Sequence, residues 1–281
     1  MSFHLLNKEP LADGVMRLLG ELLVYADSQL TDKDIHPDAA IHEARKAVDK
    51  LHALLRLVRP ALGKKTCKRL DASLRDCRRE LDCSRDSTAL PDTLQKLTSH
   101  FSVMLDDAAL EPVRQSLTSR HSLALQQYLS TLDITATRKK LDRLAQQLAG
   151  LNLEQLSRKT LRAGVRKTNQ RCRRALKELR SSPTTENSHA FCRQLKCLWY
   201  QLRLLRKRKS IKLLQHTDTL RDIEQTLGQD NDLAVLIETL HHHPEITGNP
   251  VCREFLVSLA ETRRIALLSR TLRLAAPVFA D

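Results

Sequence analysis

Apolar residues recur along most of the chain at intervals of three and four, which is the period of an amphipathic helix. Prolines and short polar runs separate the periodic segments, at positions where helices begin or end. No alternating stretch rich in Val or Ile predicts a strand, so we expect an all-α fold. The pattern predicts helices at residues 11–30, 38–59, 64–83, 92–110, 112–131, 136–148, 154–180, 186–209, 211–227, 232–242 and 251–274.

The segment 188–209 has the most sharply divided helical faces. One face carries Phe191, Leu195, Leu198, Leu202 and Leu205 and is apolar enough to pack. The other carries hydrogen-bond donors and cations, namely His189, Arg193, Lys196, Tyr200, Arg203 and Lys207. A solvated charged surface is the simplest explanation of such a face, and a binding surface for an anion is the alternative.

Three further predicted helices repeat this cationic face. Segment 38–59 places His42, Arg45, Lys46 and Arg56 together, with Asp49 among them; the alternative to a binding face here is a packed helix with exposed charges and an internal ion pair from Asp49 to Lys46 or Arg45. The faces of the segments 64–83 and 154–180 are formed by Lys64, Lys65, Lys68, Arg75 and Arg79, and by Lys159, Arg162, Arg166, Arg173, Lys177 and Arg180. Like charges at this spacing destabilise a helix unless an anion lies between them.

The positive charge of the chain is concentrated in one block. The whole sequence has a formal net charge of +14, and residues 158–209 hold 17 Lys and Arg against two acidic residues, Glu178 and Glu186. This concentration indicates a polyanionic partner, such as nucleic acid, a phosphorylated polymer or an anionic membrane surface.

The cysteines and the hydropathy pattern indicate the cellular compartment of the protein. Seven cysteines without a CxxC motif, and no signal peptide, predict reduced thiols in a cytoplasmic protein. The longest apolar run is too short for a transmembrane helix, so we expect no membrane partner.

Two stretches half a chain apart resemble each other. In the first, His42 leads a basic helix and Asp86 follows 44 residues later; in the second, His189 leads and Asp232 follows 43 residues later. Repetition at a fixed offset predicts two helical bundles related by a pseudo-twofold. We expect Asp86 and Asp232 to cap helices, and the run of three histidines at 241–243 to be a polar helix end.

With these motifs the sequence resembles the CHAD domain, the conserved histidine α-helical domain, over about residues 10–275. The resemblance rests on His42 with Arg45, on Arg85-Asp86, on His189 with Lys196 and Tyr200, and on Leu227-Gly228 with Asn231-Asp232. It implies one CHAD-like domain over residues 1–281, with an N-terminal half at about 10–150 and a C-terminal half at about 151–275. It also implies a basic groove or pore between the two bundles that binds inorganic polyphosphate, and with this ligand an association with polyphosphate granules.

The expected polyphosphate-binding residues combine the cationic faces with this resemblance. They are His42, Arg45, Lys46, His52, Arg56, Lys68, Arg75, Arg79, Arg162, Arg166, Arg173, Lys177, His189, Arg193, Lys196, Tyr200, Arg203 and Lys207. His42 and His189, when near the anion, should titrate upward. The chain departs from the basic residues that the family prefers at Asp49, His52, Cys192 and Trp199.

No catalytic motif, metal site or cofactor fingerprint accompanies these residues, so we expect a binding protein and not an enzyme. Two alternatives stay open. A nucleic-acid-binding helical protein fits the charge, although Tyr200 is the only aromatic residue on a cationic face. A polyphosphate hydrolase would use a divalent metal held by Asp86 or Asp232.

Overall fold

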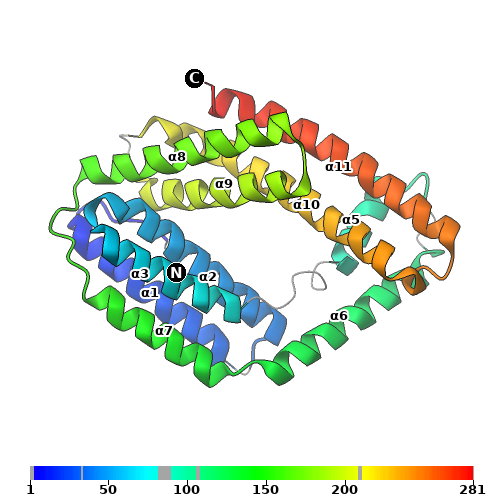
Figure 1. Ribbon diagram of the computed structural model, residues 1–281, viewed down its shortest axis with the longest axis horizontal. Coiled ribbons are helices and arrows are strands. Elements are labelled where there is room, and N and C mark those ends of the chain that lie inside the picture. Colours follow the sequence, from blue (N-terminus) through cyan, green and yellow to red (C-terminus); the bar gives the residue numbers. More distant parts are fainter. Residues whose placement is uncertain (1–2, 33, 82–89, 106–107, 208–210, 281) are drawn as a thin grey trace. The chain divides into compact units, whose positions relative to one another are not determined.

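The computed structural model describes residues 3–32, 34–81, 90–105, 108–207 and 211–280, and every regular element within these ranges is a helix (Figure 1). The predicted all-α fold is therefore confirmed. The elements are α1 (Leu11–Thr31), α2 (Pro37–Val58), η1 (Arg59–Ala61), α3 (Lys64–Glu80), α5 (Leu90–His100), α6 (Glu111–Thr131), α7 (Ile134–Ala149), α8 (Arg158–Ser181), α9 (Thr185–Leu205), η2 (Lys212–His216), α10 (Thr217–His242), η3 (Pro244–Ile246) and α11 (Pro250–Val278).

The chain divides into two compact units, each built from three segments. Unit 1 comprises residues 1–82, 132–178 and 193–220, and unit 2 comprises residues 83–131, 179–192 and 221–281. The pseudo-twofold relation between the halves of the chain, and a groove or pore between them, stay predictions.

Unit 1 is centred on four helices that pack side by side (Figure 1). Helix α1 packs on α2 and α7, and α3 also packs on α2 and α7. The apolar stripe of α1 explains its place, because residues three and four apart, such as Val15, Leu18 and Leu22, are fully buried. Helix α2 buries a wider surface, which includes Leu51 and Leu54, because other helices cover it on several sides.

Helix α8 crosses α2 at very close range. A Cβ atom added to Gly164 would lie only 2.0 Å from the backbone oxygen of Leu57, which is far inside van der Waals contact. Only glycine allows the two backbones to approach this closely. The contact brings the basic residues of α8 next to the basic residues of α2.

Replacing Gly164 with alanine should therefore destabilise the protein. The new methyl group must push α8 away from α2, at a cost of at least about 2 kcal/mol of unfolding free energy. Gly20 provides the matched control, because it lies in α1 with no atom within 4 Å of an added Cβ. Gly20→Ala should instead stabilise by about 0.5 to 1 kcal/mol. Urea unfolding measures both, and an unchanged midpoint for Gly164→Ala would contradict the close crossing.

The two helices predicted at 211–227 and 232–242 are wrong as separate elements. After the short η2, a single helix, α10, runs from Thr217 to His242. Gly228 lies within it and meets no atom within 4 Å of an added Cβ, so it costs some helix propensity without breaking the helix. No proline stands between the two predicted segments, and tertiary packing of the leucines on both sides keeps the helix continuous.

Unit 2 has a core of leucines from α5, α6, α10 and α11, including Leu94, Leu117 and Leu236. The edge of this core carries a buried polar network. The hydroxyl of Ser188 donates to Asp230 Oδ2 at 2.8 Å, and Arg264 Nε donates to Oδ1 at 2.9 Å.

A second nitrogen of Arg264 donates to the hydroxyl of Thr185 at 3.0 Å. The Asp230 carboxylate thus joins the start of α9 to α10 and α11, and its own hydrogen bonds compensate for its burial.

Candidate anion-binding surface

Helices α2 and α9 bring five basic side chains together in unit 1. On α2, His42, Lys46 and Lys50 follow one another at intervals of four residues, so they lie on one face. On α9, Lys196 and Arg203 are close enough to act on them electrostatically. We call these five residues the α2–α9 cluster.

Burial and neighbouring positive charges both act on the pKa values of His42 and Lys50. Burial lowers the pKa of His42 below its ordinary value, and the charges of Lys46 and Lys196 lower it further. Burial likewise lowers the pKa of Lys50, and Lys46 and Arg203 add to the effect. A bound anion would relieve this repulsion.

The carboxylate of Asp49 lies beside this cluster. Asp49 Oδ2 lies 3.3 Å from Lys196 Nζ of α9, and its Oδ1 lies 3.5 Å from Arg78 Nη1 of α3. The Asp49 side chain is only 14% exposed. Asp49 therefore connects three helices, and it occupies a position that is attractive to any other anion.

Lys46 has a partner other than Asp49 in the structure. It pairs with Glu43, at 2.6 Å between Nζ and Oε1. Glu43 also accepts a hydrogen bond from the hydroxyl of Tyr25 in α1 at 3.0 Å. Asp49 turns toward α3 and α9, where two cations from other helices reach it.

A second group of cations lies toward the end of α2. Arg56 donates from Nη1 to Gln194 Oε1 of α9 at 3.1 Å. Burial lowers the pKa of Arg171 on α8, and the nearby charges of Arg56 and Arg59 lower it further. Helices α2, α8 and α9 thus all contribute to one basic region.

His52 lies on this surface as a neutral side chain. Burial lowers its pKa to about 4, with the charge of Arg56 as the next cause. Its Nε2 lies 4.0 Å from Asp71 Oδ1, and the other oxygen of Asp71 lies 3.7 Å from Arg59 Nη1. At neutral pH His52 therefore offers a hydrogen bond and no positive charge.

The predicted residues of α3 do not join these groups. Lys68, Arg75 and Arg79 are exposed, and Arg79 pairs with Asp76 on its own helix at 3.9 Å. The cation of α3 that reaches α2 is Arg78, which the sequence analysis did not select. Neighbouring residues on a helix point about 100° apart, so only the packing of α3 decides between Arg78 and Arg79.

The other predicted cations of unit 1 lie at its surface. The exposed ones are Arg162, Arg166, Lys177, Arg193 and Lys207, and the half-buried ones are Arg45 and Arg173. The structure also adds Lys50 and Arg171, which sequence reasoning missed. Lys50 had a usable signal, because it continues the spacing of His42 and Lys46 by one more turn.

The placement of Tyr200 on the exposed cationic face is wrong. Its side chain is only 3% exposed, and its ring packs edge-on against Phe3 with 6.0 Å between ring centroids. The N-terminal segment causes this burial, because the amide of Leu5 donates to the carbonyl of Leu204 at 2.9 Å and holds the segment against α9. The pattern of α9 alone does not contain this contact.

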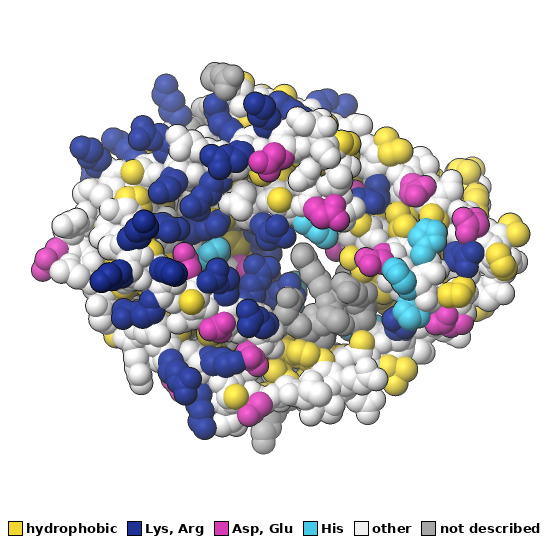
Figure 2. Space-filling view, in the orientation of Figure 1, with side chains coloured by type: hydrophobic (Ala, Val, Ile, Leu, Met, Phe, Trp, Pro, Cys, Tyr) yellow, Lys and Arg dark blue, Asp and Glu magenta, His cyan; other side chains and the backbone are white. Residues whose placement is uncertain are grey.

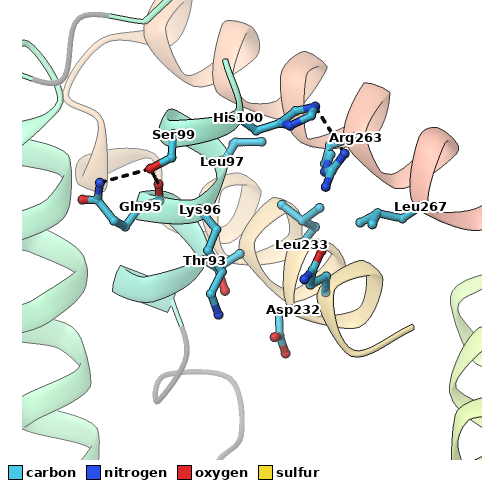
Figure 3. Close-up of a pocket in the computed structure, with 11 residues that line it drawn as sticks. Thr93, Gln95, Lys96, Leu97, Ser99, His100, Asp232, Leu233, Arg263 and Leu267 are labelled. Carbon is cyan, nitrogen blue, oxygen red and sulfur yellow. Dashed lines mark hydrogen bonds between the residues drawn. The ribbon is translucent and has the colours of Figure 1, made fainter. Parts of the chain in front are cut away.

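The remaining predicted positions belong to unit 2 or lie outside the described residues. His189 is in the part of α9 that belongs to unit 2, and Asp86 is not among the described residues. Asp232 does not cap a helix, because it lies in the middle of α10. It lines a pocket of about 360 Å³ in unit 2, together with Lys96 and Arg263 (Figure 3).

The described ranges contain neither a cluster of metal ligands nor a membrane-spanning helix. No three His, Cys, Asp or Glu side chains there are arranged to hold a metal ion. In the histidine run, Nε2 of His243 lies 2.6 Å from Arg120 Nη2, and its Nδ1 lies 3.0 Å from Glu245 Oε1. None of the described helices is both long and apolar enough to span a bilayer.

Figure 2 shows how the charged side chains are distributed on the surface of unit 1. Lys and Arg side chains crowd the surface over α2, α8 and α9, with few acidic side chains among them. A surface of this kind can bind a polyanion by charge and by hydrogen bonds from guanidinium and ammonium groups.

Comparison with known proteins gives consistent results. The sequence profile described as the CHAD domain matches residues 15–241. The crystal structure of the CHAD domain from the plant Ricinus communis is similar over 100% of this chain and 96% of that chain, with a TM-score of 0.67 and 16% sequence identity. At this identity the likeness establishes the fold. A comparison with curated proteins found no match.

Proposed function

Because this chain belongs to the CHAD family, which is associated in general with polyphosphate binding, we propose that it binds inorganic polyphosphate through unit 1 and does not cleave it. The observation that carries the proposal is the gathering of cations from four helices of unit 1. Arg78 of α3 and Lys196 of α9 flank Asp49 of α2, and Arg171 of α8 lies near Arg56 and Arg59. Cations from separate helices repel one another, and a bound polyanion would stabilise their arrangement.

The geometry of α2 suits an extended chain of phosphates. Basic residues follow the helix from His42 to Arg59, a length of about 25 Å at about 1.5 Å per residue. Arginine binds phosphate oxygens in a bidentate way, and lysine supplies a point charge. A linear polymer with one charge on every unit can contact several of these residues in succession.

The acidic residues of this surface do not favour hydrolysis. Asp49, Asp71 and Glu43 are each engaged by a cation, and they lie in separate ion pairs. Metal-assisted phosphoryl transfer uses carboxylates that converge on one or two metal ions. Release of orthophosphate from polyphosphate in the presence of Mg²⁺ or Mn²⁺ would overturn the non-catalytic proposal.

Nucleic acid is the less favoured ligand, because the surface offers little for bases to stack on. Tyr200 is buried, and the ring of Trp199 is covered by the guanidinium of Arg203 at 4.7 Å from its centroid. Single-strand binders depend on exposed aromatic rings. Polyphosphate should therefore displace RNA and duplex DNA when all are present at equal phosphate concentration.

A titration with long-chain polyphosphate at several salt concentrations tests the proposal directly. We expect a dissociation constant below about 1 μM at low salt. The logarithm of the association constant should fall linearly with the logarithm of the salt concentration, because binding releases counterions. A dissociation constant of about 1 μM or higher that does not depend on the length of the polymer would contradict the proposal.

The pKa of His42 predicts a pH dependence of binding. In the free protein this pKa is lowered by burial and by neighbouring cations, so the ring is mostly neutral near pH 7. A bound polyanion neutralises those cations and should raise the pKa, so binding takes up a proton. Affinity should then rise as pH falls, by about fivefold between pH 8 and pH 5.5.

The variant His42→Gln should remove this pH-dependent gain, because glutamine does not titrate. Comparing the two proteins at each pH cancels any titration of the polymer itself. His52 is not expected to contribute, since its pKa of about 4 keeps it neutral over this range. Equal pH profiles for the two proteins would show that His42 does not sense the ligand.

A further inference from the structure

A basic pocket lies in unit 1 where α2 ends. It has a volume of about 580 Å³, with η1 and the start of α3 on one side and α8 on the other. Its lining comprises Arg59, Pro60, Leu62, Lys64, Cys67, Ala163, Arg166, Lys167 and Gln170. Four of these side chains are cationic and none is acidic. The sequence analysis assigned no role to Arg59 and Lys167, and it placed Lys64 on a cationic face without expecting it to bind polyphosphate.

An acidic residue next to the pocket neutralises its positive charge only weakly. Asp71 approaches Arg59, but at 3.7 Å, and it is shared with His52. Helix α3 begins at Lys64 after Gly63, which has no side chain to cap the first turn. The positive end of the helix dipole therefore adds to the four side-chain charges.

The pocket is continuous with the basic surface of α2. Arg59 lines the pocket and also acts on Arg171 of α8, whose other cationic neighbour is Arg56. A polymer that follows α2 toward its C-terminal end therefore arrives at this pocket. The surface along α2, which we call the track, is long enough for an extended chain, whereas the pocket has room for a compact group.

We propose that this pocket binds the terminal phosphate of a polyphosphate chain, and this inference rests on the proposed function. Each internal phosphate carries one negative charge. A terminal phosphate has a second acidic oxygen and carries a charge of about −1.5 to −2 at pH 7. Four converging cations suit the group with the highest charge density on the polymer. The protein should therefore distinguish free chain ends from chain interiors.

The experiment compares short polyphosphate with free ends and the same polymer with both ends capped. An uncharged alkyl amine linked to each terminal phosphorus through a phosphoramidate bond removes the second ionisation and leaves the interior unchanged. We expect the wild-type protein to bind the free-ended polymer about tenfold more tightly than the capped one at low salt.

The pocket variant is Lys64→Glu with Lys167→Glu, since both side chains are exposed and neither belongs to the predicted track. It should lose the preference for free ends and bind both polymers alike. The matched control is Lys65→Glu with Lys159→Glu, which makes the same charge change on the same two helices outside the pocket. The control should keep the preference.

Each other result overturns this inference. Equal binding of both polymers by the wild-type protein would show that chain ends are not recognised. If the pocket variant keeps the preference, chain ends bind elsewhere on the protein. If the control loses the preference, the effect depends on the net charge of the protein and not on the pocket. Failure to bind either polymer is a different outcome, because it would contradict the proposed function itself.

Discussion

We expect the double substitution Lys196→Glu with Arg203→Glu to weaken binding of long-chain polyphosphate by about a hundredfold or more. Both cations face the basic residues of α2, so each reversal removes an attraction and adds a repulsion at the centre of the surface. The free energy of the effect is large because these side chains are partly desolvated. Fluorescence anisotropy with labelled polyphosphate measures it, and the salt dependence should become shallower.

The control is Lys139→Glu with Arg158→Glu, two exposed residues of unit 1 on α7 and α8. It changes the net charge equally and should cost less than about threefold in affinity. A second variant, Lys196→Gln with Arg203→Gln, tests the same site if the charge reversal prevents folding, because it places no new charge beside Asp49. Equal losses in the two reversal variants would mean that overall charge, and not this cluster, determines binding.

We expect Asp49→Asn to bind polyphosphate about tenfold more tightly, the equivalent of about 1.4 kcal/mol. The carboxylate competes with the ligand for Lys196 and Arg78, and the amide removes this competition while keeping nearly the same shape. The same change should lower the unfolding free energy of the free protein by about 1 to 2 kcal/mol, because two cations lose their partner. Binding titrations and urea unfolding measure the two effects.

Asp76→Asn is the matched control, because this exposed acid on α3 pairs with Arg79 away from α2. Its affinity should match that of the wild-type protein within about twofold. Weaker binding by Asp49→Asn would reverse our interpretation. It would mean that the carboxylate holds Lys196 in the position that the ligand needs.

Much of the fold follows from local pattern. The burial of Val15, Leu18 and Leu22 on α1 is what their spacing predicts, and the prediction of an all-α fold is confirmed. The continuity of α10 was not predictable in this way. Gly228 and the polar residues after it resemble a helix boundary, and only the packing on either side keeps the helix intact.

The candidate surface was predictable to a lesser degree. Periodicity correctly placed Lys46, Lys196 and Arg203 on polar faces, and the structure brings them together. It did not indicate that Arg78 would be the residue of α3 that reaches Asp49. It also placed Tyr200 among the exposed cations, whereas the N-terminal segment covers that residue.

Helical class, the apolar faces and the concentration of positive charge depend on residue type and spacing, so the chain specifies them locally. Which cations share one region depends on how α2, α3, α8 and α9 pack, and Gly164 sets the closest of these contacts. A single helix leaves several side chains available on each polar face. Neighbouring helices select among them, because they decide which side chains are covered, which find a partner such as Asp49, and which converge on a pocket.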